Sequence, residues 1–346
     1  MTVSKSSLSS IPTCYATVSI GTPNTPLDQK LKAIAEAGFQ GVELGFPDLL
    51  SFASKNYDKD VDAQDFDNLC DAGRKVGIMC EEVGLKIVML QPFSNFEGWP
   101  EGSEGREDAF RRAKGWIRIM QAVGTDMLQV GSTDSSHAVS SLSHLASDLQ
   151  QLCDLLAPHK FRLAYENWCW ATHAPDWKDV WAIVQEVDRD NIGLCLDTFQ
   201  TAGGEWADPT TASGLIEREG GKVAQEIQFQ SSLKALGNTV PKEKIYILQI
   251  SDAYKPPSPL DAEADEQGLR PRGRWSSCLR PVPFDGGYLP VVEVAKAVLE
   301  TGFRGWFSME VFDGGPDGQD QEWKDMGAYA KKAMRSHERL LEEAAD

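Results

Sequence analysis

Short apolar runs alternate with longer amphipathic segments along nearly the whole chain. Eight runs have the length and composition of buried strands, and they cover residues 13–19, 41–45, 86–90, 127–130, 162–166, 192–197, 245–249 and 306–310. Helical periodicity follows each of them, at residues 27–37, 64–83, 107–123, 141–156, 177–187, 221–236, 289–301 and 322–345. Eight βα units in series predict an α/β fold, a closed (βα)8 TIM barrel.

No shift in composition marks a boundary between domains, so we expect one barrel over residues 12–346. The Ser-rich residues 1–11 are predicted to be a flexible N-terminus. An open doubly wound sheet is the second choice, but no Gly-x-Gly-x-x-Gly follows the first strand. Two long segments, residues 203–220 and 256–287, follow strands six and seven. They therefore belong to the face of the barrel that carries active sites.

Four of the predicted strands end in an oxygen-bearing side chain. These residues are Glu166, Asp197, Gln249 and Glu310. A single acid at a strand end is more often a helix cap, but the four strands are consecutive, so their ends lie on one arc of the rim. Three carboxylates and an amide suit a hard divalent cation of the Mg²⁺, Mn²⁺ or Co²⁺ type.

Charge and cysteine content narrow the class of protein. The 34 basic and 52 acidic residues give a formal charge of -18, which disfavours nucleic acid and anionic membranes as partners. No apolar run is long enough to span a bilayer. Seven cysteines without a Cys-x-x-Cys pair predict a reduced compartment, the cytoplasm. Both a monomer and a homo-oligomer are consistent with the sequence, because the apolar stripe of residues 326–341 could pack on a neighbour or on its own barrel.

Several motifs resemble those of the fungal 3-dehydroshikimate dehydratases of quinate catabolism, which belong to the xylose isomerase-like barrel superfamily. They are YENWCW at residues 165–170, GLCLDTFQ at 193–200, ADPTTASG at 207–214, LQPFS at 90–94, DAYK at 252–255, and Trp275-Ser276 with Arg280 five residues past the tryptophan. The resemblance spans nearly the whole chain. It implies that Glu166, Asp197, Gln249 and Glu310 bind the divalent metal.

The chain departs from the family pattern beside the expected site. Gly45, Phe46 and Pro47 stand where the family has Phe-His-Glu after the second strand. Gly204 and Ser277 stand at two positions where arginine is common. These differences leave the superfamily and the metal set in place, but they bear on the identity of the substrate, which could be a related polyol or keto acid.

A metal site of this kind supports enolate chemistry. The ion stabilises the enolate formed when an α-proton leaves. Loss of the β-hydroxyl then defines a dehydratase, and with 3-dehydroshikimate the product is the aromatic acid protocatechuate. Returning the proton instead would define a sugar or ketose epimerase or isomerase, the alternative function. An apurinic-site endonuclease shares the barrel, but it needs more histidines and a basic face.

Other residues are candidates for proton transfer and for substrate binding. Glu43 near the end of the second strand, and His173 and Lys255 beyond the ends of the fifth and seventh, could act as the base, although a loop lysine is often only a solvated charge. Arg280 is the candidate for a substrate carboxylate, because its spacing from Trp275 matches the family. Trp168 and Phe93 could form the wall of a flat pocket, and Gln200 completes the predicted substrate contacts.

Overall fold

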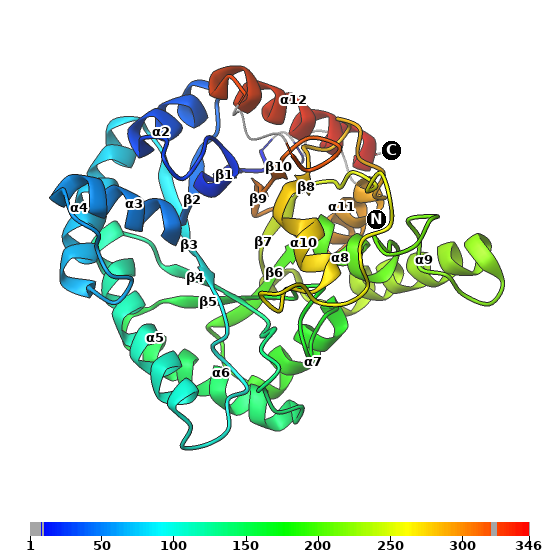
Figure 1. Ribbon diagram of the computed structural model, residues 1–346, viewed down its shortest axis with the longest axis horizontal. Helices are drawn as coiled ribbons and strands as arrows, with labels where there is room; N and C mark the ends of the chain where they lie inside the picture. The colour runs from blue at the N-terminus through cyan, green and yellow to red at the C-terminus, as the bar shows by residue number, and fades with distance from the viewer. Residues whose placement is uncertain (1–7, 9, 320–323, 346) are drawn as a thin grey trace.

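The predicted barrel is confirmed by the computed structural model, which describes residues 8, 10–319 and 324–345. Eight parallel strands close into a ring in the order β1-β2-β3-β4-β5-β6-β7-β9 (Figure 1). The strands of the ring are β1 Thr13–Ala16, β2 Gly41–Gly45, β3 Lys86–Phe93, β4 Met127–Gly131, β5 Arg162–Glu166, β6 Ile192–Asp197, β7 Ile245–Ile250 and β9 Trp306–Met309. Each lies on one of the predicted runs.

Helices surround the ring on its outside (Figure 1). The α-helices are α2 Leu27–Glu36, α3 Phe46–Tyr57, α4 Phe66–Glu82, α5 Glu104–Val123, α6 Leu142–Leu156, α7 Trp177–Val187, α8 Thr198–Glu205, α9 Gly221–Thr239, α10 Pro271–Cys278, α11 Val291–Glu300 and α12 Met326–Ala345. Helices α3, α8 and α10 have no counterpart in the sequence prediction. The last two occupy the predicted long loops or their start, on the side where the strands end.

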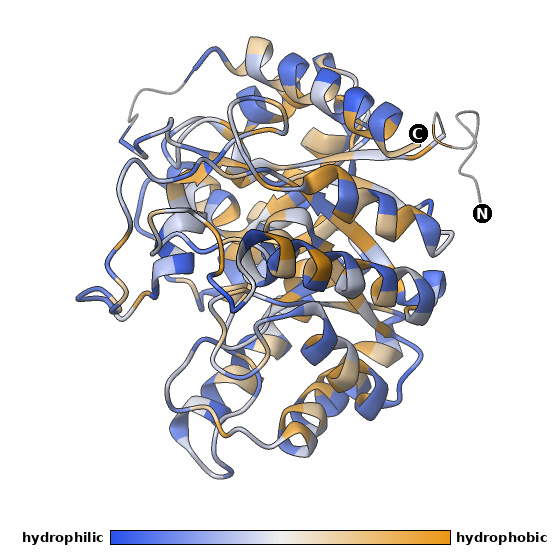
Figure 2. Ribbon diagram, turned by 90° about the vertical axis from the view of Figure 1, so that its right-hand side faces the viewer, coloured by the Kyte–Doolittle hydropathy of each residue, from blue (hydrophilic) through white to orange (hydrophobic). Residues whose placement is uncertain are grey.

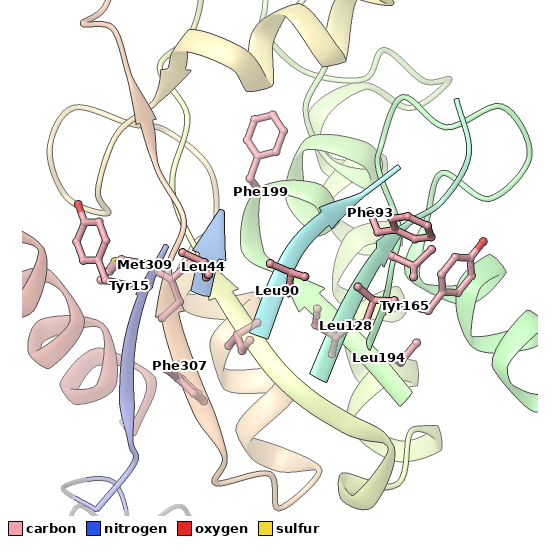
Figure 3. Close-up of a cluster of buried hydrophobic side chains, with 14 of the residues drawn as sticks. Tyr15, Leu44, Leu90, Phe93, Leu128, Tyr165, Leu194, Phe199, Phe307 and Met309 are labelled. Atoms are coloured by element: carbon pink, nitrogen blue, oxygen red, sulfur yellow. The ribbon is translucent and has the colours of Figure 1, made fainter. Parts of the chain in front are cut away.

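Alternation along each strand separates the interior of the barrel from the layer beneath the helices. Cys14, Met127 and Ala164 belong to a small apolar cluster inside the ring. Their strand neighbours, including Leu128 and Tyr165, belong to the larger core that the helices cover (Figure 3). Figure 2 shows the corresponding pattern on the helices, whose hydrophobic positions turn inward. This period-2 alternation fixes which residues at the strand ends point into the mouth.

A small antiparallel pair of strands lies outside the ring. Strand β8, Leu279–Arg280, pairs with β10, Phe312–Asp313. Because α10 leads directly into β8, these elements together form a cover over the end of β9. This arrangement brings Arg280 to the mouth from a segment that the sequence prediction treated as loop.

Capping residues lie at several helix ends. Asp176 begins α7 with a reciprocal capping box with Asp179. Gly38 and Gly84, just past the ends of α2 and α4, have φ angles of 96° and 76°, a conformation that is strained for residues with a side chain.

The terminal segments bear on two expectations. Most of the predicted flexible N-terminus, residues 1–7 and 9, lies outside the described residues, although Leu8 and Ile11 are buried in the core. Flexibility there stays a prediction. The apolar stripe of α12 packs on its own barrel, against α2 and α11.

All seven cysteines are free thiols, and no helix in the described ranges is long and apolar enough to cross a membrane.

Candidate metal centre

Three predicted ligands meet at the mouth of the barrel. Glu166 ends β5, Asp197 ends β6, and Glu310 follows β9 directly. Each offers one carboxylate oxygen, and these oxygens all lie within 4.8 Å of one another. All three residues are buried. The convergence expected from the shared register of the strands is therefore present.

Gln249 joins the same cluster through its amide nitrogen. Its Nε2 donates to Glu310 Oε1 at 3.0 Å and to Glu43 Oε2 at 2.8 Å. Its Oε1 instead accepts from the Cys195 thiol at 3.1 Å. The amide would have to turn by half a rotation to present its oxygen to a cation, so the ligand role of Gln249 stays a prediction.

The guanidinium of Arg280, on β8, contacts the carboxylate cluster. Its Nη2 donates to Asp197 Oδ2 at 2.5 Å and to Glu310 Oε2 at 3.0 Å. Ser251 and Ser276 accept from its other nitrogens at 2.9 and 3.2 Å. The guanidinium is fully buried, so the residue predicted to bind a substrate carboxylate already compensates two carboxylates of the protein.

Negative charge exceeds positive charge in this cluster. Glu43, Glu166, Asp197 and Glu310 face the single guanidinium of Arg280. Burial, followed by the neighbouring carboxylates, raises the pKa of Glu166 well above its usual range. Burial likewise raises the pKa of Glu310, against the opposing effect of Arg280. Such a set is costly without a further cation.

The donor atoms fit a divalent metal ion. Glu166 Oε1 is buried and has no hydrogen-bond partner. A buried carboxylate oxygen without a partner is rare in folded proteins and is well suited to bind a cation. With carboxylate oxygens as donors, a hard ion of the predicted type matches this site better than a thiophilic one.

Trp168 borders the cluster as predicted for a pocket wall. Its Nε1 donates to Glu166 Oε2 at 3.4 Å, and its ring stacks on Trp170 with centroids 5.1 Å apart. A Cβ added to Gly131 would lie 2.1 Å from the Trp168 ring, so glycine at the end of β4 makes room for it.

Two other predicted substrate contacts lie elsewhere. Phe93 is fully buried between β3 and α5, with its ring 4.7 Å from that of Trp116, so it belongs to the core and not to the mouth. That expectation failed because Phe93, at the end of the longer β3, points outward from the ring. Gln200 is buried and accepts from the Cys169 amide at 2.9 Å. It ties α8 to the segment after β5.

The three candidates for proton transfer are placed very differently. Glu43 is part of the cluster through Gln249. The ring of His173 bonds the Ala138 carbonyl at 2.8 Å, and the exposed Lys255 donates to the Ala212 carbonyl at 2.7 Å. In this arrangement Glu43 is the candidate that the structure brings to the carboxylates.

Residues at the departures from the family pattern have structural roles. A Cβ on Gly45 would lie 2.2 Å from Val18, so a side chain there is excluded. Phe46 stacks on Trp116 at 4.6 Å, and Pro47 occupies the first turn of α3. A Cβ on Gly204 would lie 3.2 Å from the Cβ of Cys169. At residues 45–47 the chain passes directly from β2 into α3.

Sequence reasoning missed two glutamines of the mouth. Gln91 donates to Glu310 Oε1 at 3.3 Å, and Gln129 donates to Glu166 Oε2. Both interrupt the apolar runs of β3 and β4. An amide inside a buried strand needs a partner, and that requirement is the signal that could have revealed them.

A family model described as the xylose isomerase-like TIM barrel matches residues 31–336. The chain belongs to this family. It is similar to the 3-dehydroshikimate dehydratase of Neurospora crassa, with 33% identity over 301 residues that cover 83% of this chain and 81% of that protein. The predicted resemblance to the fungal enzymes is thereby confirmed.

Longer proteins share the barrel as one part of their length. The 3-dehydroshikimate dehydratase of Pseudomonas aeruginosa is 32% identical over 300 residues, covering 87% of this chain but 38% of that protein. Among solved structures, a xylose isomerase-like TIM barrel/4-hydroxyphenylpyruvate dioxygenase fusion protein superposes with a TM-score of 0.70 at 26% identity. That match covers 94% of this chain and 42% of the fusion protein.

Proposed function

We propose that this protein is a divalent-metal-dependent 3-dehydroshikimate dehydratase that forms protocatechuate. The observation that carries the proposal is the similarity to the Neurospora enzyme over most of both chains, together with the carboxylate cluster at the strand ends of this barrel. Glu166, Asp197 and Glu310 would hold the cation, with Gln249 as the fourth ligand after its amide turns. The partner is a small molecule, and we place the enzyme in the cytoplasm.

The bound cation would supply Lewis-acid stabilisation of the negative charge that develops on the substrate carbonyl oxygen. Glu43 is the group best placed to remove the α-proton, because its carboxyl is buried and bonds Gln249 within the cluster. The carbon–hydrogen bond breaks toward Glu43, the β carbon–oxygen bond breaks, and the proton leaves with the hydroxyl as water. Enolisation of the remaining ketone then completes the aromatic ring.

Pocket residues would control water and orientation. Trp168 would cover one face of the ring, and its stacking on Trp170 limits its rotation. Arg280 holds the positions of Asp197 and Glu310, and its Nη1 group, bonded to Ser276, is the edge that could reach a substrate carboxylate.

The test uses the purified protein, stripped with a chelator and then reloaded with Mn²⁺, Co²⁺ or Mg²⁺. We expect 3-dehydroshikimate to yield the absorbance of protocatechuate only after reloading. Running the reaction in deuterium oxide separates the alternative, since an epimerase would return a sugar-like product with deuterium at the α-carbon. Full turnover after exhaustive chelation would refute the metal requirement, and deuterated ketose without an aromatic product would refute the dehydratase.

A further inference from the structure

Three buried glutamines donate amide hydrogens to the carboxylates of the cluster. Gln91 lies on β3, Gln129 on β4 and Gln249 on β7, and each is at most 2% exposed. Each donates an amide hydrogen to a carboxylate of the cluster. The donors are neutral, so they orient the carboxylates without cancelling the negative charge that a cation needs.

Gln129 is hydrogen-bonded at both ends of its side-chain amide. Its Nε2 donates to Glu166 Oε2 at 2.5 Å, and its Oε1 accepts from the backbone amide of Phe93 at 3.2 Å. Both ends of the side-chain amide are therefore fixed, which sets its orientation. Glu166 Oε2 also receives the weaker contact from Trp168, whereas Glu166 Oε1 has no hydrogen-bond partner.

Glu310 is held differently. Its Oε1 accepts from both Gln91 and Gln249, and its Oε2 accepts from Arg280. Losing Gln91 would leave two of these three donors in place. For Glu166, in contrast, Gln129 is the principal donor, and loss of Gln129 leaves a long contact at 3.4 Å.

We infer that Gln129 is a positioning residue for metal binding. It holds Glu166 by one oxygen and leaves the other oxygen free as a ligand atom, and it links this geometry to the backbone at the end of β3. The inference rests on the metal site of the proposed function. It goes further by ranking the glutamines: Gln129 governs cation affinity, and Gln91 contributes little.

The experiment compares single variants of the full chain, with Mn²⁺ affinity measured by calorimetry after chelation. Gln129→Met and Gln91→Met remove the amides at similar side-chain length. Gln225→Met is the matched control, because Gln225 is also buried and bonds backbone carbonyls of residues 205 and 206, away from the cluster. Unfolding of the metal-free proteins in urea reports any general loss of stability.

We expect Gln129→Met to bind Mn²⁺ about 10- to 100-fold more weakly than the parent, the range found for residues that orient metal ligands. Gln91→Met should lose less, and Gln225→Met should bind Mn²⁺ as the parent does even if it unfolds more easily. The visible spectrum of the Co²⁺-loaded protein should change more in Gln129→Met than in Gln91→Met, because Glu166 loses its principal donor whereas Glu310 keeps two, and it should not change in Gln225→Met.

Parental Mn²⁺ affinity and an unchanged Co²⁺ spectrum in Gln129→Met would overturn the inference while leaving the proposed function intact. Failure of the parent itself to bind either ion would overturn both. Should Gln129→Met not fold, Gln129→Asn keeps an amide but is one methylene too short to bond both Glu166 and the Phe93 amide. A parental Co²⁺ spectrum in that variant would equally refute the role of Gln129.

Discussion

Glu43 combines burial with contact to the carboxylate cluster. Burial raises the pKa of its carboxyl to about 7, and the Ser308 hydroxyl and the Gln249 amide oppose that rise. A base of this kind can both accept a proton and release it near neutral pH. From β2 it bonds Gln249, which in turn bonds Glu310, so Glu43 lies beside the ends of β7 and β9.

The first prediction concerns this carboxyl. Glu43→Gln should lower kcat by about 100-fold, the usual scale of acid–base catalysis, while Mn²⁺ binding persists. Lys255→Met and His173→Gln serve as controls, because their present partners are backbone carbonyls away from the cluster. Steady-state kinetics on 3-dehydroshikimate decide the matter. Parental turnover in Glu43→Gln would return the proton transfer to one of the other two.

Arg280 gives a second prediction, one of stability. In the metal-free protein, Arg280→Met would leave Asp197 and Glu310 as buried carboxylates without their cation, at a cost of about 3 to 5 kcal/mol. Added Mn²⁺ should restore part of that loss, because it supplies positive charge to the same oxygens. Urea unfolding with and without Mn²⁺ measures both effects.

Arg274→Met is the control for that experiment. Arg274 belongs to the same α10 segment but bonds only backbone carbonyls, of residues 261, 263 and 269. Equal destabilisation of the two variants, or no response to Mn²⁺, would contradict the assigned role of Arg280.

Some residues of the site were predicted from the sequence, and others were misplaced or missed. Glu166, Asp197 and Glu310 were predictable because parallel strands share a direction, which brings their last residues together. Phe93 was misplaced because the register of β3 shifts between Leu90 and Phe93, which turns Phe93 to the outer side of the ring. Gln91 and Gln129 were missed because their function depends on neighbours from other strands.

At the scale of elements, α2 and α3 are joined by a buried ion pair. Lys30 Nζ lies 2.7 Å from Asp48 Oδ1 and also donates to the Thr17 carbonyl at 3.2 Å. Lys30 is 1% exposed and Asp48 is 4% exposed, so neither can recover water if its partner is lost. The pair ties α3, which begins directly after β2, to α2.

We therefore expect Lys30→Met to lower the free energy of unfolding by about 3 to 5 kcal/mol, since it leaves a charged Asp48 buried. The double variant Lys30→Met/Asp48→Leu should recover most of that loss, because both charges are gone. Denaturant unfolding of the two single variants and the double variant completes the cycle. Additive losses would show that the two side chains do not interact.

Elements differ in how far sequence predicts them. Helix α7 was predicted with its exact limits, because Asp176 marks its start and its apolar period is strong. Helix α8 was missed because it begins at Thr198, immediately after β6, with Asp197 accepting from the Phe199 and Gln200 amides. A residue read as the end of a strand is here also a helix cap. Helix α10 is short and rich in arginine and serine, without an apolar period.

For the whole molecule, acid stability is a measurable consequence of how α12 docks on the barrel. His337 of α12 is buried, with its ring edge-on to Phe307, and burial lowers its pKa to about 4. The unfolded chain, with an ordinary value near 6.5, takes up the proton first. Stability is therefore lost as pH falls from about 6.5 to 4, by roughly 3 kcal/mol.

The fourth prediction follows. His337→Phe keeps a ring in this site but cannot be protonated, so its unfolding free energy should fall less between pH 6.5 and 4 than that of the parent. The comparison is made between the two proteins at each pH, which cancels the titration of the carboxyls they share. Parallel pH profiles would refute a contribution from His337.

Closure of the barrel has a consequence for biosynthesis. Strand β9 completes the ring by pairing with β1, Thr13 with Phe307, and Glu310 comes directly after it. A chain still emerging from the ribosome carries Glu166 and Asp197 long before it carries Glu310 and Arg280. The carboxylate cluster thus cannot be complete before the segment that carries β8 and β9 has been made. Any cation held by this cluster would therefore bind after the ring has closed.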